Sequence, residues 1–401
     1  MYYRKQLQGQ TVKRSPWRAI AAACIVAAGL CFVVGLFVVG LTDKNASQRD
    51  FIQYWAAGQQ LIHRANPYDF DAILQLERAV GLEGNVPKIS FSPPVALFLV
   101  LPLGLVGAKT GLILWLLVQL GCLILSVRIL WIVNGRAASG LEFTGIAFAP
   151  ALACLMAGQL GIFFLLSISI FLLVHESHPL VAGAVLFPCS LKPHLFLTCT
   201  IVLVLWAVHR RAFRIPVGFC IAFLASCALT LSIDRHVWSE YAQMMPLVGV
   251  SRVFVPTLSV ALRFLLDRNA IWLQYIPEFL ACAWALWYFQ SRRDRWKWID
   301  QGLLLLLVSA VCTPYGFFFD EVVLFPAVLA ALYRAEESGR SLLPFALIAG
   351  GALCELLMGP GMTTPYYLWT PLAWLAWYLY ATRSKRVSTQ EADTSPAAHA
   401  T

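Results

Sequence analysis

Asp50 stands where the first long apolar segment of the chain gives way to a polar loop. A carboxylate at the mouth of a membrane protein is suited to take a proton from a hydroxyl group. Tyr54 and Trp55 follow in a short helical pattern and could stack on sugar or lipid, although aromatic residues are also ordinary interface anchors. A structural role for Asp50 is equally open, because Asp50 followed by Gln53 fits an N-cap with its capping-box partner.

Lys192 is the second candidate, in the stretch Ser190-Leu-Lys-Pro-His194 between two apolar runs. An ionisable group inside a membrane segment is a functional candidate by default, and a cation at this place suits the phosphate of a lipid. His194 could support the same phosphate. The alternatives are a lysine that extends to the lipid head groups and a histidine with a purely structural role.

Four further side chains are candidates for substrate binding. Gln159 follows Gly158 between apolar segments, so its amide could bond a sugar hydroxyl or only satisfy a helix end. Asp320 and Glu321 begin an apolar run, where they could bind an acceptor hydroxyl or act as a second acid/base. A helix N-terminus favours carboxylates in any case. Arg252, in a second polar loop, could contact a phosphate.

Motifs of several other enzyme classes are missing from the sequence. It has no Walker loop, no dinucleotide fingerprint, no nucleophile elbow and no DxD pair. Asp69-Phe-Asp71 has the DxD spacing but follows the turn signal Asn66-Pro-Tyr68. Most of the eleven cysteines lie in apolar runs, without CxxC pairs or the Cys/His spacing of zinc sites. We therefore expect no metal site and no cofactor, and the sequence leaves a metal requirement open.

The composition is that of a membrane protein. Of 401 residues, 59% are hydrophobic and 13% are charged, whereas a soluble domain carries roughly a quarter charged residues. The net charge of +9 arises from short basic runs beside apolar segments, which is the pattern of the positive-inside rule. This distribution argues against nucleic-acid binding. The sequence predicts an all-α, polytopic integral membrane protein.

The chain divides into an arm, a membrane domain and a tail. We expect a cytoplasmic N-terminal arm at 1–16 and a polytopic membrane domain at 17–382. Two loops of this domain, 42–92 with interfacial helices and 233–256, are expected on the extracytoplasmic (trans) face. The polar tail at 383–401 is rich in Ser, Thr and Ala and is predicted to be disordered and cytoplasmic.

About twelve crossings, with both termini in the cytoplasm, account for the basic runs. The runs at 209–214, 291–297 and 383–386 then all lie on the cytoplasmic side. This topology requires that 93–107 dips into the membrane and returns, or lies along the interface, which protein burial permits. In the alternative topology 93–107 crosses, and another segment such as 142–157 does not.

The polar clusters, in this order and spacing, resemble glycosyltransferase family 87. The matching pieces are Asp50-Phe-x-x-Tyr-Trp-x-Ala-Gly with Asn66-Pro-Tyr68, Ser92-Pro-Pro94 with Leu101-Pro102, Gly158-Gln159, Leu191-Lys192-Pro193 and Thr313-Pro-Tyr315…Asp320. That family consists of polytopic GT-C enzymes that use polyprenyl-phosphate sugars, and polyprenol-phosphate-mannose-dependent mannosyltransferases are its best-known members. The resemblance implies that Asp50 is the catalytic base. The late family motif often contains a His where this chain has Asp320.

The resemblance further implies a GT-C-like, inverting hexosyltransferase, similar to mannosyltransferases, in a bacterial-type inner membrane. It would move sugar from a polyprenyl-phosphate donor to a lipid- or glycan-linked acceptor at the periplasmic face. Its partners would be membrane lipids, donor and acceptor. One rival is a transporter or flippase of a lipid-linked saccharide, which would favour internal pseudo-symmetry, and we find no convincing repeat. Another is a polysaccharide ligase with a diphosphate-linked donor.

Overall fold

The structure, a computed structural model, describes residues 16–39, 42–137, 139–247, 254–359, 361 and 363–383. All regular elements in these ranges are helices, which confirms the all-α prediction. The α-helices are α1 (Pro16–Val39), α2 (Asp43–Gln48), α3 (Phe51–Ile62), α4 (Phe70–Ala79), α5 (Ala108–Val133), α6 (Ala149–Ala157), α7 (Gly161–Val174), α8 (Pro179–Ala184), α9 (Leu197–His209), α10 (Arg214–Ile233), α11 (Val237–Met244), α12 (Leu258–Leu266), α13 (Ile276–Arg292), α14 (Leu303–Cys312), α15 (Phe325–Glu337), α16 (Leu343–Met358) and α17 (Thr370–Thr382). Between them lie short 3₁₀ or π turns: η2 (Pro94–Leu99), η3 (Leu101–Leu105), η4 (Leu141–Gly145), η5 (Phe187–Leu191), η6 (Pro193–Phe196), η7 (Met245–Leu247), η9 (Ile271–Tyr275), η10 (Arg293–Arg295), η11 (Trp298–Gly302), η12 (Phe318–Leu324) and η13 (Pro365–Trp369).

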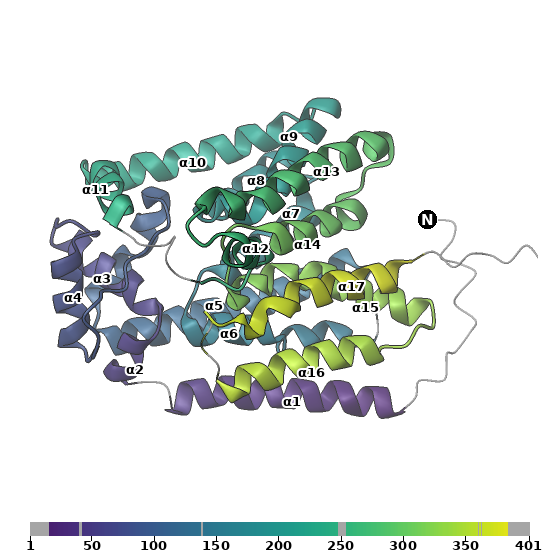
Figure 1. Cartoon of the computed structure of the whole chain (residues 1–401), viewed down its shortest axis with the longest axis horizontal. Coiled ribbons are helices and arrows are strands. Elements are labelled where there is room, and N and C mark those ends of the chain that lie inside the picture. The colour runs from purple at the N-terminus through teal and green to yellow at the C-terminus, as the bar shows by residue number, and fades with distance from the viewer. Residues whose placement is uncertain are drawn as a thin grey trace, which may run out of the picture.

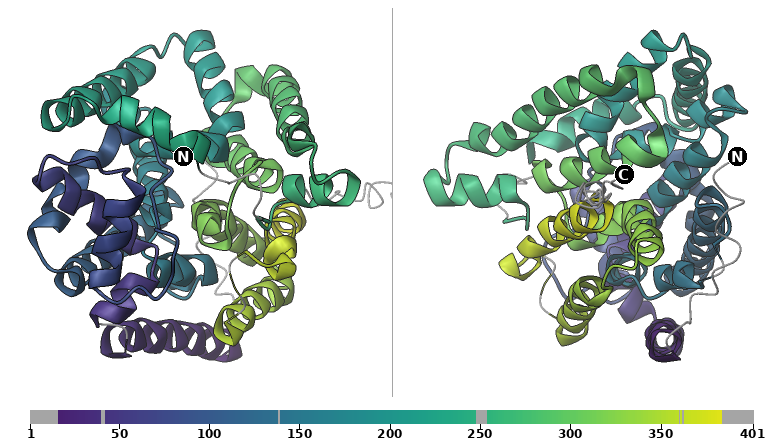
Figure 2. Two further views of the ribbon diagram at one scale, coloured as in Figure 1. Left: turned by 60° about the vertical axis from the view of Figure 1, so that its left-hand side comes forward. Right: turned by 90° about the vertical axis from the view of Figure 1, so that its right-hand side faces the viewer.

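The first polar loop and α11, in the described part of the second, lie at the same end of the molecule, whereas residues 248–253 of the second loop lie outside the described residues. In Figure 1, α2, α3 and α4 gather with α11 at the left, and the first turn of α1 and the last turn of α17 lie at the right. We call the left side the loop end. Figure 2 shows α1, the purple helix, at the margin of the molecule in both further views. It packs mainly against η4 and α6, buries Val33 against the core and leads into the loop end.

Two helices in the described part of the chain are long and apolar enough to cross a membrane, by length and composition. They are α5, with 26 residues, and α10, with 20 residues. Six further apolar helical stretches have between 10 and 17 residues, which is shorter than a typical span of about 20 residues. The count of about twelve crossings therefore stays a prediction.

The segment 93–107 forms two short turns, η2 and η3, instead of a spanning helix, and η3 packs against α3. A Cβ atom on Gly58 would lie 2.4 Å from the Val100 carbonyl oxygen, and one on Gly104 would lie 2.2 Å from the Gly58 carbonyl oxygen. Only glycine permits this backbone approach. Gln59 stabilises the contact, because its Nε2 donates a hydrogen bond to the Gly104 carbonyl at 2.8 Å.

The centre of the molecule is built from η12 and α15. All seven residues of η12 are buried, and α15 is buried over most of its length. An element that is buried on every side is enclosed by others, and α6, α7, α14 and α17 pack around this pair. Asp320 in η12 is therefore held in the interior, where a charge requires a partner.

Candidate active site

One wall of the candidate site is formed by Asp50, Tyr54 and Gln159, which we call the Asp50 wall. Asp50 occupies the N-cap position of α3, but its side chain makes no capping hydrogen bond. Its Oδ2 accepts a hydrogen bond from Gln159 Nε2 at 2.9 Å, and Gln159 Oε1 accepts one from the Tyr54 hydroxyl at 3.1 Å. The ring of Tyr54 stacks on Trp115. The capping alternative is therefore not what the structure shows, and α3 instead presents the carboxylate to a tertiary partner.

The turn between α6 and α7 places Gln159 beside Asp50. Gly158 ends α6 with φ +72°, a left-handed conformation that favours glycine at a helix C-terminus. A Cβ atom there would lie 2.7 Å from that of Phe51, so glycine also allows the turn to approach α3. Gln119 Nε2 and Cys154 Sγ both donate to the backbone carbonyl of Gln159. The turn is fixed through its backbone, and the side-chain amide is left to orient Asp50.

The opposite wall consists of Lys192 and Asp320, which we call the Lys192 wall. Lys192 lies between η5 and η6, and its ammonium is 2.6 Å from Asp320 Oδ1. The two side chains are 11% and 3% exposed. Asp320 Oδ2 accepts the backbone N–H of Phe317 at 3.1 Å, which fixes the carboxylate. Because an ammonium has three donors, Lys192 can bind a further anion while it keeps Asp320.

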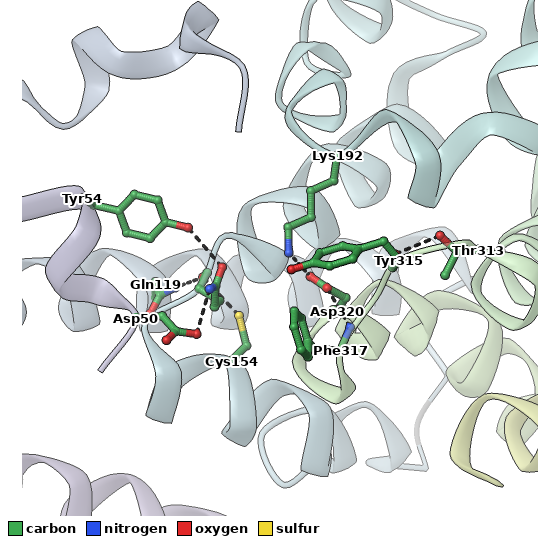
Figure 3. Close-up of polar contacts among 10 residues, drawn as sticks. Asp50, Tyr54, Gln119, Cys154, Lys192, Thr313, Tyr315, Phe317 and Asp320 are labelled. Atoms are coloured by element: carbon green, nitrogen blue, oxygen red, sulfur yellow. Dashed lines mark hydrogen bonds and ion pairs between the residues drawn. The ribbon is translucent and has the colours of Figure 1, made fainter. Parts of the chain in front are cut away.

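A cavity of about 320 Å³ separates the two walls. It is lined by the start of α3, the loop 87–92, Gln159, the stretch 191–194 and the stretch 315–319. Figure 3 shows Asp50, with Tyr54, on one side of this space and Lys192, with Asp320, on the other. His194 and Tyr315 also line it and meet edge to face, with ring centroids 5.7 Å apart. The structure therefore brings the predicted base and the predicted phosphate-binding cation to one cavity.

A second lysine, Lys88, lines the same cavity. Its ammonium donates to the Gln48 carbonyl at 2.6 Å and lies 3.7 Å from Asp50 Oδ1. Its backbone N–H donates to buried Glu77 of α4 at 3.0 Å. Burial raises the pKa of Glu77 to about 7, and the hydrogen bond from Lys88 opposes that rise. Sequence reasoning missed Lys88, because a lysine in a polar loop ordinarily points into solvent.

The sequence model of glycosyltransferase family 87 matches residues 91–314, which is more than half of the chain. The chain belongs to glycosyltransferase family 87. It is therefore a glycosyltransferase, and the predicted resemblance is confirmed. The family match includes Gln159 and Lys192 but leaves Asp50 and Asp320 outside, so their places in the site depend on geometry alone. Among curated proteins and solved structures no match was found.

Among the predicted site residues that the structure describes, Trp55, Asp320 and Glu321 do not line the cavity, and Asp320 is connected to it through its ion pair with Lys192. The indole of Trp55 is buried and donates to the Val106 carbonyl at 2.8 Å, away from the substrate space. Glu321 is buried and accepts a hydrogen bond from the Thr370 hydroxyl at 2.6 Å, on the α17 side of η12. Arg252 lies outside the described residues. Neither Trp55 nor Glu321 lines the cavity, so the geometry gives them structural contacts instead.

The glutamine of the Asp50 wall provides a test of how the family 87 site orients its carboxylate. Gln159→Leu removes the amide that donates to Asp50 Oδ2, so we expect kcat to fall on the order of ten- to a hundredfold, the cost of one charge-assisted hydrogen bond. Gln159→Glu places a second carboxylate there and should cost more. Tyr54→Phe removes only the bond to Gln159 Oε1 and should cost less. Steady-state kinetics that show an altered donor KM with unchanged kcat would contradict this role.

Proposed function

We propose that this family 87 enzyme transfers a sugar from a polyprenyl-phosphate donor to a lipid- or glycan-linked acceptor, with inversion at the anomeric carbon. The observation that carries the proposal is the opposition of Asp50 and Lys192 across one cavity. An inverting displacement needs a base at the acceptor side and a charge partner at the leaving-group side. The two walls supply one of each. Mannose is the donor sugar to test first.

Asp50 accepts the proton of the acceptor hydroxyl while the oxygen of that hydroxyl forms a bond with the anomeric carbon. The bond from that carbon to the phosphate oxygen breaks, and its electron pair leaves with the phosphate. Lys192 stabilises the charge that grows on this oxygen, because an oriented cation in a buried site is worth more than one in water. The proton then passes from Asp50 to water. No step requires a metal ion or a cofactor, and we propose that none is resident.

An apolar cavity of about 360 Å³ supports a lipid-linked donor. It lies among α7, α9, α10 and α14 and is lined by Ser190 and Pro193, the residues that flank the Leu191-Lys192 pair of the polar cavity. The same short stretch thus contributes to both cavities. A phosphate on Lys192 would therefore have an apolar space beside it for the first isoprene units of its lipid tail.

We further propose that the enzyme is a multi-pass protein of the inner membrane, with about twelve crossings and both termini in the cytoplasm. The surface of α10 supports a membrane setting, because Ile221 and Leu224 are more than half exposed along this apolar helix. Such a face is costly in water and suits lipid. The loop end, with the polar cavity, would then face the periplasm.

Cysteine labelling tests this orientation. In a variant that lacks the eleven native cysteines, Ser239→Cys probes the loop end, where α11 lies, and Arg210→Cys probes the basic run between α9 and α10. Both positions are exposed. We expect a membrane-impermeant maleimide to label position 239 in intact spheroplasts, and to label position 210 only after permeabilisation. The reverse pattern would place the cavity on the cytoplasmic side and overturn the proposed topology.

Product analysis tests the reaction itself. The purified enzyme is supplied with polyprenyl-phosphate mannose, polyprenyl-phosphate glucose or a diphosphate-linked sugar, together with a panel of alkyl glycoside acceptors. We expect a glycoside of inverted configuration from at least one polyprenyl-phosphate donor. Transfer from the diphosphate-linked donor alone would favour a ligase. Movement of the lipid donor across a liposome bilayer without transfer would favour a flippase.

A further inference from the structure

Lys88 gives the cavity a second cation, on the Asp50 side. Its ammonium lies 3.7 Å from Asp50 Oδ1, and its side chain is 31% exposed. Lys192, on the opposite side, has a carboxylate at 2.6 Å and is 11% exposed. The Lys88–Asp50 pair is therefore looser and wetter than the Lys192–Asp320 pair. A partly exposed pair of this kind adds little to stability, so the position of Lys88 calls for another explanation.

The surroundings of Lys88 hold it in place. Both carboxylate oxygens of buried Glu77 lie within 3.3 Å of the Lys88 backbone nitrogen. The side chain is held separately, since its ammonium donates to the carbonyl of Gln48 at the end of α2. Two helices of the first loop thus fix the backbone and the ammonium of one residue. This preorganisation is typical of a ligand-binding group, because the ordering cost has been met before the ligand arrives.

The inverting reaction separates the roles of the two lysines. In an inverting displacement the attacking hydroxyl and the leaving oxygen lie on opposite faces of the sugar ring. The base must be at the attacking face, so a cation 3.7 Å from Asp50 lies with the acceptor. The leaving phosphate belongs on the opposite face, where Lys192 is available. The assignment of Lys88 to the acceptor side rests on the proposed function.

Proton transfer changes the charge beside Lys88. Before reaction Asp50 is negative, with Oδ2 bound to Gln159 and Oδ1 directed to Lys88. When Asp50 takes the acceptor proton it becomes neutral, and Lys88 loses its nearest carboxylate. Lys192 keeps Asp320 throughout. A negative group on the acceptor would neutralise Lys88 at this stage and would also recognise the acceptor before the reaction.

We propose that the acceptor carries an anionic group, a phosphate or a carboxylate, that binds Lys88 while a hydroxyl of the same acceptor meets Asp50. Ser90 and Ser92 line the cavity on the same loop and provide neutral donors for the remaining acceptor oxygens. The enzyme would thus distinguish its two substrates by the cation that each one binds. The anionic group of the acceptor binds Lys88, and the phosphate of the donor binds Lys192.

The test compares acceptors that differ only in charge. Full-length enzyme is assayed with its best polyprenyl-phosphate donor on an octyl glycoside, on the phosphate monoester of that glycoside and on the corresponding octyl uronic acid. For the wild type, we expect the KM of at least one anionic acceptor to be lower than the KM of the neutral acceptor, by a factor on the order of ten to a hundred. The phosphate and uronate arms identify which anion fits.

Variants of Lys88 supply the decisive comparison. Lys88→Met should raise the KM of the anionic acceptors to the level of the neutral one and leave the donor KM unchanged, whereas Lys88→Arg should retain most of the preference. The matched control is Lys44→Met in the same loop, whose ammonium pairs with Glu83 at an exposed surface. We expect that control to behave as wild type.

Two outcomes would overturn the inference while sparing the proposed reaction. One is a wild type that transfers sugar equally well to neutral and anionic acceptors. The other is a Lys88→Met enzyme whose kcat falls equally for all three acceptors with KM unchanged, which would restrict Lys88 to holding Asp50. A wild type that binds the donor but transfers sugar to none of the acceptors would overturn the proposed function, and this inference with it.

Discussion

Asp50→Asn is expected to leave a folded enzyme that binds the lipid donor and has lost turnover by about a hundred- to ten-thousandfold. An amide cannot take the acceptor proton, whereas its oxygen can still accept the hydrogen bond from Gln159 Nε2. The architecture of the Asp50 wall should therefore survive. The measurement is kcat at saturating donor, together with donor binding and thermal unfolding in detergent.

Asp69→Asn is the matched control for this substitution. Asp69 lies in the same loop and caps α4, since its side chain accepts the Ala72 backbone N–H at 2.9 Å. Asparagine caps helices about as well as aspartate, so this variant should keep both stability and turnover. If purified Asp50→Asn transfers sugar at close to the normal rate, the base lies elsewhere, and Asp320 is the next carboxylate to test.

Residue type indicated two charged members of the site, although not Lys88, and local chemistry predicted a turn in the first loop. Lys192 stood out because an ionisable group between apolar segments is a functional candidate, and Asp50 because a carboxylate at the mouth of a membrane protein suits proton abstraction. The turn expected at Asn66 is present, with the Asn66 side chain accepting the Tyr68 backbone N–H at 2.8 Å. Both inferences needed only neighbours in sequence. The sequence did not indicate that Lys192 would pair with Asp320, because 128 residues separate them.

Side-chain direction accounts for the candidates that the cavity does not include. Tyr54 and Trp55 are adjacent in α3, and successive helical residues point about 100° apart. Tyr54 therefore faces Gln159 while Trp55 faces η3. The same divergence in η12 directs Asp320 to Lys192 and leaves its neighbour on another side. Which member of each pair points toward the site is set by the packing of the whole element, and a single sequence does not fix that rotation.

The Lys192 wall gives the second large effect. Lys192→Met alone would leave Asp320, 3% exposed, without its cation, and breaking a buried pair from one side costs about 3–5 kcal/mol. Loss of activity in that variant could then reflect unfolding. The double variant Lys192→Met with Asp320→Asn removes both charges and keeps both shapes, and the amide oxygen introduced at position 320 would still accept the Phe317 N–H. It should fold.

In this double variant we expect donor binding and turnover to fall together, because the missing ammonium contacts the phosphate both before and during its departure. One lost charged hydrogen bond costs about 1.5–3 kcal/mol, which corresponds to roughly ten- to a hundred-and-fiftyfold in kcat/KM for the donor. The acceptor KM should be unchanged. Normal kinetics in a well-folded double variant would reduce Lys192 to a structural counterion of Asp320.

Asp320→Asn tests the same site from the other side of the ion pair, because it keeps the cation and removes its partner. Lys192 is then a buried charge without a counterion, so we expect this variant to unfold at a lower temperature than wild type when no ligand is present. The phosphate of the donor can replace the lost carboxylate. Ligand that binds only the folded state stabilises it by mass action, so polyprenyl phosphate should raise the unfolding temperature of Asp320→Asn more than that of wild type. The double variant should respond least of the three. If all three respond alike, the phosphate does not bind at Lys192.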